Sequence, residues 1–151
     1  MLHFSDGQPF TTGGAAFGYR AITGTGETPR LLLQVSIEGI LTEAIVDTGA
    51  PYLVCNPYLA KHLRLDSAPS LHSVNLTIRG YCIRGELFRL ALTLMADEGS
   101  DLEIETTPFV PALDESQIWE LPTFLGMQGC LERVRFAIDP NKERFYFGTT
   151  E

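Results

Sequence analysis

The stretch Ala44-Ile45-Val46-Asp47-Thr48-Gly49-Ala50 joins an apolar run to a carboxylate, a hydroxyl and a glycine. Two successive β-branched residues favour an extended backbone, and Gly49 can adopt backbone angles that are closed to other residues. A second apolar run, Tyr52-Leu53-Val54-Cys55, follows at once. The pattern predicts a strand that ends at Asp47, then a sharp turn. The carboxylate would lie between two buried segments, where an unpaired charge is costly.

Two interpretations of Asp47 follow from these residues. Asp often caps a turn by accepting hydrogen bonds from nearby backbone amides. However, two aliphatic residues precede this one and Ala50 follows the glycine, and in that frame the stretch resembles the active-site motif of aspartic peptidases. A single Asp-Thr-Gly in the chain is typical of the retropepsin-like branch. The resemblance implies that Asp47, Thr48 and Gly49 are catalytic and that Ala50 contacts substrate.

A later stretch, Pro122-Thr123-Phe124-Leu125-Gly126, also stops an apolar pair at a glycine. Retropepsin-like chains carry such an element, which crosses the strand bearing the catalytic Asp and is followed by a short helix. Phe124-Leu125-Gly126 fits this element, and residues 129–133 fit the helix. The resemblance extends from about Leu31 to Gly148 and is greatest to short bacterial single-domain members.

Alternating apolar residues predict β-strands through most of the chain, whereas Asn56-Pro57 is typical of a helix start and predicts one short helix over residues 58–63. The resemblance implies an all-β fold. This would be a retropepsin-like closed β-barrel, equivalent to half of a pepsin-like bilobal enzyme, with one or two short helices. Residues 1–29 are rich in glycine and lack sustained periodicity, so we expect an irregular lead-in before a peptidase domain at 30–151.

A β-hairpin is predicted where the alternation of Val74 to Ile78 breaks at Arg79-Gly80 and resumes over residues 87–95. A slip between Leu87 and Leu90 indicates a bulge. The resemblance implies that the tip, within residues 79–85, is a flap over bound peptide. Its substrate-binding residues would be Arg79, Gly80 and Tyr81, together with Arg84. An exposed tip with solvated arginines remains the alternative.

The amino-acid composition indicates which partners and ligands to expect. The 151 residues fit one domain, and eleven basic residues against nineteen acidic ones give a formal charge of −8, which excludes nucleic acid as a favoured partner. No apolar stretch approaches a membrane span, so we expect a soluble, cytoplasmic protein without a membrane partner. Cys55, Cys82 and Cys130 lack Cys-x-x-Cys spacing, and neither His62 nor His72 lies at ligand spacing from them. We therefore expect free thiols, no metal and no cofactor.

The function implied by the resemblance is that of an aspartic endopeptidase. Peptide hydrolysis by water needs both a base and an acid, and one carboxylate cannot be both. With one motif per chain, a homodimer would supply an Asp47 from each subunit against an extended peptide or protein substrate. Retroviral enzymes have a stabilising Asp–Arg ion pair where this chain has Pro51 and Met127. An inactive peptide- or protein-binding module, and a barrel in which Asp47 is only structural, remain alternatives.

Overall fold

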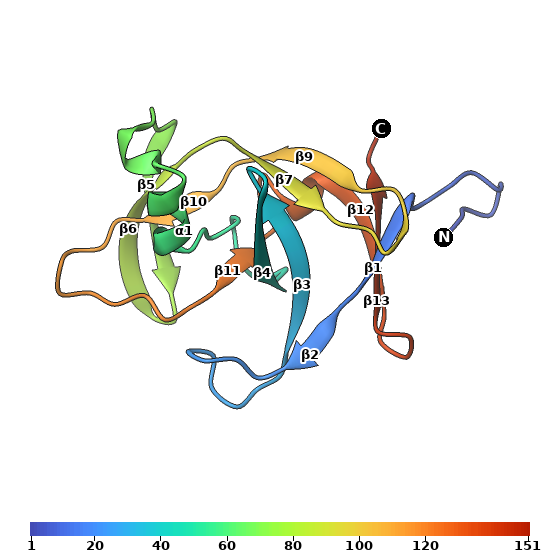
Figure 1. Cartoon of the computed structure of the whole chain (residues 1–151), viewed down its shortest axis with the longest axis horizontal. Helices are drawn as coiled ribbons and strands as arrows, with labels where there is room; N and C mark the ends of the chain where they lie inside the picture. The colour runs from blue at the N-terminus through green and yellow to red at the C-terminus, as the bar shows by residue number, and fades with distance from the viewer.

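The computed structural model describes all residues 1–151, and β-strands make up most of its regular secondary structure (Figure 1). One α-helix and two short 3-10 helices interrupt them. This confirms the predicted all-β class. The strands are β1 (Gly13–Ala16), β2 (Gly18–Arg20), β3 (Arg30–Ile37), β4 (Ile40–Val46), β5 (His72–Ile78), β6 (Tyr81–Leu87), β7 (Leu90–Leu94), β8 (Glu98–Gly99), β9 (Leu102–Thr106), β10 (Phe109–Pro111), β11 (Thr123–Leu125), β12 (Val134–Asp139) and β13 (Arg144–Thr149); the helices are α1 (Pro57–His62), η1 (Leu65–Ser67) and η2 (Leu131–Arg133).

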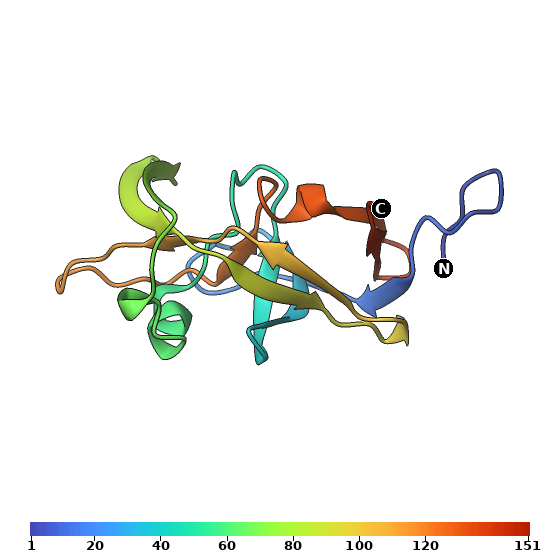
Figure 2. The same ribbon diagram turned by 90° about the horizontal axis from the view of Figure 1, so that it is seen from above.

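The strands form three hydrogen-bonded groups. The largest has the order β11-β4-β3-β7-β9, with β2 added to β3; a second has the order β12-β13-β1-β8, and a third β10-β6-β5. Both views place β5, β6 and α1 at the end of the molecule opposite the two chain termini (Figures 1 and 2). No helix is long and apolar enough to cross a membrane.

The main core lies against β3 and β4. Alternation along β3 buries Leu33, Val35 and Ile37, which belong to one cluster with Phe145 and Phe147 of β13. Fully burying a side chain of this size contributes about 1.5–3 kcal/mol, so the cluster fixes which face of β3 is internal. Because β4 pairs with β3, its register is fixed as well. The position of Asp47, which follows the last residue of β4, Val46, is therefore fixed.

The late element β11 lies parallel to β4, with Phe124 opposite Ile45 and Leu125 opposite Val46. Parallel neighbours require a long crossover between them, and here the crossover includes α1 and the β5–β6 hairpin. The structure therefore confirms that residues 124–126 lie beside the strand leading to Asp47. The helix expected at 129–133 is shorter than predicted, because only Leu131–Arg133 form a 3-10 turn.

The prediction of an irregular segment over residues 1–29 was wrong for two stretches. β1 pairs with both β13 and β8, and β2 pairs with β3. Gly13 resembled a loop signal in the sequence, but a Cβ at this position would overlap the Phe147 ring and the Ser100 carbonyl. The glycine allows close strand packing instead of making a turn.

The predicted short helix and hairpin are present in the structure, whereas the predicted bulge is not. The short helix forms at residues 57–62, and the Asn56 side chain accepts a hydrogen bond from the Tyr58 N–H at 2.8 Å, as expected of an N-cap. The hairpin is confirmed with its tip at Arg79-Gly80, but its second strand is Tyr81–Leu87 and not residues 87–95, as predicted. The predicted bulge between Leu87 and Leu90 was wrong: β6 ends at Leu87, and β7 begins at Leu90 with new partners, β3 and β9.

Candidate active site

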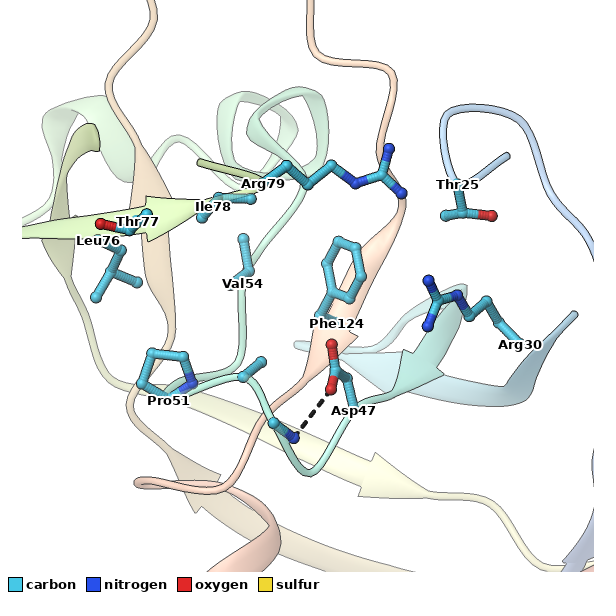
Figure 3. Close-up of a pocket in the computed structure, with 12 residues that line it drawn as sticks. Thr25, Arg30, Asp47, Pro51, Val54, Leu76, Thr77, Ile78, Arg79 and Phe124 are labelled. Atoms are coloured by element: carbon cyan, nitrogen blue, oxygen red, sulfur yellow. Dashed lines mark hydrogen bonds between the residues drawn. The ribbon is translucent and has the colours of Figure 1, made fainter. Parts of the chain in front are cut away.

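Asp47 is the first residue after β4 and is fixed on both sides by hydrogen bonds. Its backbone N–H donates to the Leu125 carbonyl at 3.0 Å, and its carbonyl accepts from the Ala50 N–H at 3.1 Å. Its carboxylate oxygen Oδ1 accepts from the Gly49 N–H at 2.9 Å, the bond dashed in Figure 3. Asp47 thus caps its own turn, as the simpler interpretation expected. That role occupies only one carboxylate oxygen.

The turn after Asp47 is tied to the late element by backbone bonds. The Met127 N–H donates to the Ala50 carbonyl at 2.9 Å, and the Gln128 N–H donates to the Pro51 carbonyl at 2.6 Å. Beyond the turn, Val54 and Phe124 exchange two bonds of 2.9 and 3.0 Å. Backbone pairing therefore holds this turn at Pro51 and Met127, the positions where retroviral enzymes have an Asp–Arg ion pair that this chain lacks.

A cleft of about 240 Å³ opens over the Asp47 carboxylate, which is half-buried (Figure 3). Its walls come from the Asp47 turn, the β5 end of the hairpin, β11 and the segment before β3. The presence of this cleft argues against the alternative in which Asp47 is only a structural residue. The lining residues are Thr25, Arg30, Asp47, Gly49, Ala50, Pro51, Val54, Leu76, Thr77, Ile78, Arg79 and Phe124.

Four residues singled out in the sequence meet in this cleft: Asp47, Gly49, Ala50 and Arg79. Thr48 lies next to them in the turn but is exposed, and its hydroxyl has no hydrogen-bond partner within the chain. The Arg79 guanidinium donates to the carbonyl of Gly24, which connects the hairpin tip to the segment before β3.

Three other hairpin residues do not line the cleft. Gly80 lies at the exposed tip with a φ of 82°, and the Tyr81 side chain is 74% exposed. Arg84 is exposed further along β6. Within a single chain, the contribution of the hairpin to the cleft therefore comes from residues 76–79 of β5 and the tip.

Several lining residues were not identified from the sequence. Leu76 and Ile78 could have been found, because strict alternation places them on one face of β5. Arg30 and Thr25 had no comparable signal. They reach the cleft because β3 runs antiparallel to β4, which brings the start of β3 next to the end of β4.

The histidines and cysteines lie apart from this site. No group of three or more His, Cys, Asp or Glu side chains is placed to hold a metal ion. Cys55 and Cys130 are buried free thiols, and burial raises the pKa of each to about 12. A thiol in that state is a poor nucleophile, and neither cysteine lines the cleft, where Asp47 is the one acidic residue.

Comparisons with known proteins agree with this geometry. No protein-family model matches the chain, and no curated protein gives a significant match. Among solved structures, the chain is similar to the crystal structure of a retropepsin-like aspartic protease from Rickettsia conorii, at 20% identity and a TM-score of 0.54. The match covers 90% of this chain and 91% of that one. The chain therefore has the retropepsin-like fold of aspartic proteases, as its sequence predicted.

Proposed function

We propose that the protein is an aspartic endopeptidase that acts as a homodimer. The observation that carries the proposal is the position of Asp47: the carboxylate lies at the end of β4, in a turn locked to β11, and opens into a cleft of the retropepsin-like fold. The similar structure from Rickettsia conorii is that of a retropepsin-like aspartic protease, and we propose the same activity for this chain.

The chemistry requires a second acid. Among the twelve cleft residues Asp47 is the only carboxylic acid, so one subunit provides either a base or an acid but not both. In a two-fold dimer the partner's Asp47 would supply the other. Two carboxylates in contact share one proton, as in the aspartic-protease dyad that serves as the standard example. The ionised member would take a proton from water while the protonated member polarises the scissile carbonyl.

The exposed Thr48 supports a dimer of this kind. Its hydroxyl lies one residue from the carboxylate and makes no bond within the chain. In retropepsin-like enzymes the Thr of this motif bonds across the two-fold axis, and Thr48 is free to do the same. The proposed interface thus begins at the turn that contains the catalytic acid.

The substrate in this proposal is an extended peptide. The cleft has an apolar wall formed by Val54, Leu76, Ile78 and Phe124. β5 is an edge strand of its sheet, so one side of its backbone has no strand partner. An extended chain can pair with such backbone edges while alternate side chains enter apolar pockets. The hairpin tip would act as the flap that excludes water from the reaction.

Asp47→Asn tests the proposal. It keeps the size of the side chain and the oxygen that accepts from Gly49, but it removes the acid. We expect cleavage of a fluorogenic peptide library to fall at least about a thousandfold, with an unchanged thermal unfolding midpoint. Asp66→Asn, at an exposed acid in η1 away from the cleft, is the matched control and should cleave normally. Full activity in Asp47→Asn would refute the proposal.

A peptide-binding module without catalysis is the second candidate. The bond from Arg79 to the Gly24 carbonyl favours it, because this bond anchors the hairpin tip to the rest of the chain, which suits retention of a peptide better than rapid release. Isothermal titration with library peptides separates the two. A binder would hold peptides intact with the same affinity in the wild type and in Asp47→Asn.

A further inference from the structure

The cleft contains a pair of arginines whose charges are not neutralised by the chain. Arg30 begins β3, and Arg79 lies at the hairpin tip, yet both line the same cavity as Asp47. In Figure 3 both guanidinium groups lie on one side of the Asp47 carboxylate, with the Thr25 side chain close to them. The one acid of the cleft therefore shares this cavity with two cations.

Neither arginine has a carboxylate partner. Four other arginines each form an ion pair with a Glu or Asp: Arg20, Arg89, Arg133 and Arg144. Arg30 and Arg79 form none, and the three further arginines without an ion pair, Arg64, Arg84 and Arg135, do not line the cleft. Arg30 lies directly across from Arg20 in the β2–β3 ladder, and Arg20 takes the nearby Glu43 carboxylate at 2.5 Å. Because Glu43 is already paired with Arg20, it does not neutralise the charge of Arg30.

Arg79 has an unfavourable backbone conformation. Its φ of 52° lies in the left-handed region, and the two-residue turn it forms with Gly80 normally selects Asn, Asp or Gly. Its guanidinium bonds to a neutral carbonyl, which uses hydrogen-bond donors without balancing the charge. Both cations thus remain available to an acidic group that enters the cleft.

The local charge is opposite to that of the whole molecule. The chain carries −8, but exposed charges farther than about 8 Å apart are largely screened at physiological salt. Within the proposed dimer, four arginines would surround a carboxylate pair that shares one proton and so carries one negative charge. The arginines therefore dominate the field that a ligand meets inside the cleft.

We infer that the peptidase prefers substrates with a Glu or Asp side chain near the scissile bond, recognised by Arg30 and Arg79, an inference that rests on the proposed function. Guanidinium groups bind carboxylates bidentately, and both arginines are exposed, so an acidic side chain that enters the cleft can reach them. Successive side chains of an extended peptide point to opposite faces. An acidic residue could face the arginines while its neighbours contact the apolar wall of Val54, Leu76, Ile78 and Phe124.

The test uses matched fluorogenic peptides that differ only in Glu or Gln at one position, chosen from the library sequences that the enzyme cuts. We expect kcat/KM to be about tenfold higher for the Glu peptide, the size of one charge-assisted hydrogen bond. Raising the salt concentration should reduce this ratio. In Arg30→Met and Arg79→Met the ratio should fall toward one. Arg84→Met, which removes an exposed hairpin arginine outside the cleft, should leave the ratio unchanged.

Binding measurements keep this inference separate from the catalytic proposal. Fluorescence anisotropy with labelled Glu and Gln peptides and the Asp47→Asn protein should show the same preference for Glu, and Arg30→Met in that background should remove it. Cleavage without any preference for Glu would overturn the inference and leave the peptidase proposal intact. Absence of cleavage together with tighter binding of the Glu peptide would overturn catalysis but support the inference. Equal binding of both peptides would overturn the inference.

Discussion

The backbone of Gly126 packs directly against the carbonyl group of Tyr52. A Cβ at position 126 would lie 2.6 Å from the Tyr52 carbonyl carbon and 2.7 Å from the Ala50 oxygen, as well as overlapping the Tyr52 oxygen. Both neighbours are backbone atoms of the segment that follows Asp47, so a change of side-chain rotamer cannot relieve the overlap. The turn and the late element can come together only because residue 126 lacks a side chain.

Gly126→Ala should therefore destabilise the fold at the active-site turn. Overpacking of a well-packed region costs about 1–3 kcal/mol, and contact with backbone on both sides places this variant at the upper end. Chemical denaturation should show a corresponding loss in the free energy of unfolding. Gly18→Ala is the control, because a Cβ there meets only the Leu32 side chain at 3.9 Å. Equal stability of both variants would contradict the packing argument.

Thr48→Val tests the predicted role of the exposed hydroxyl. The substitution keeps the branched shape but removes the donor, so only a bond to a partner subunit is lost. Loss of one such bond should weaken the dimer about tenfold or more, as measured by sedimentation equilibrium, while the monomer keeps its thermal midpoint. Thr23→Val, at an exposed loop threonine, should leave the dimer unchanged. An unchanged monomer–dimer equilibrium in Thr48→Val would contradict the predicted bond.

Local sequence signals correctly predicted three structural elements around Asp47. The strand ending at Asp47, the apolar pair before Gly126 and the Asn56 cap depend on neighbours in sequence, and the structure contains all three. The alternation of short strands agreed with the fold class, which the resemblance implied. These features are decided by backbone preference and burial over a few residues, which a sequence displays directly.

Long-range features could not be predicted in the same way. β1 pairs with β13, which lies at the other end of the chain. Its two glycines resemble loop residues in the sequence, but Gly13 packs against the Phe147 ring and Gly14 against the Tyr146 ring. Thr25 and Arg30 reach the cleft through the antiparallel arrangement of β3 and β4. The break between Leu87 and Leu90 arises because β6 and β7 pair with different strands. The local alternation of residues does not indicate which strands pair.

The buried thiols predict how stability depends on pH. Burial raises the pKa of Cys55 and Cys130 from 9.0 to about 12, so the folded protein retains these protons while the unfolded chain loses them above pH 9. The stability contributed by each thiol is full below pH 9 and falls as the pH rises toward 12. Between pH 8 and 10 the loss should be about 1.4 kcal/mol per thiol.

Urea denaturation at several pH values measures this effect. Because other groups also titrate, the comparison is with Cys55→Ala, whose free energy of unfolding should fall less steeply over the same range. Cys82→Ser is the control, since this cysteine is exposed and should leave the slope unchanged. Identical slopes in the wild type and Cys55→Ala would show that Cys55 ionises equally in both states.

Ala50→Ser should move the acid limb of the pH–rate profile to lower pH. Pepsin-like enzymes have Ser at this position, and its hydroxyl stabilises the ionised carboxylate. Ala50 lines the cleft beside Asp47, so an added hydroxyl would donate to the member of the pair that acts as base and keep it ionised in more acidic solution. One such bond corresponds to about one pH unit. The profile of kcat/KM from pH 3 to 8 measures the change, with Ala112→Ser, outside the cleft, as the control. A limb that stays in place or moves to higher pH would contradict this account of Ala50.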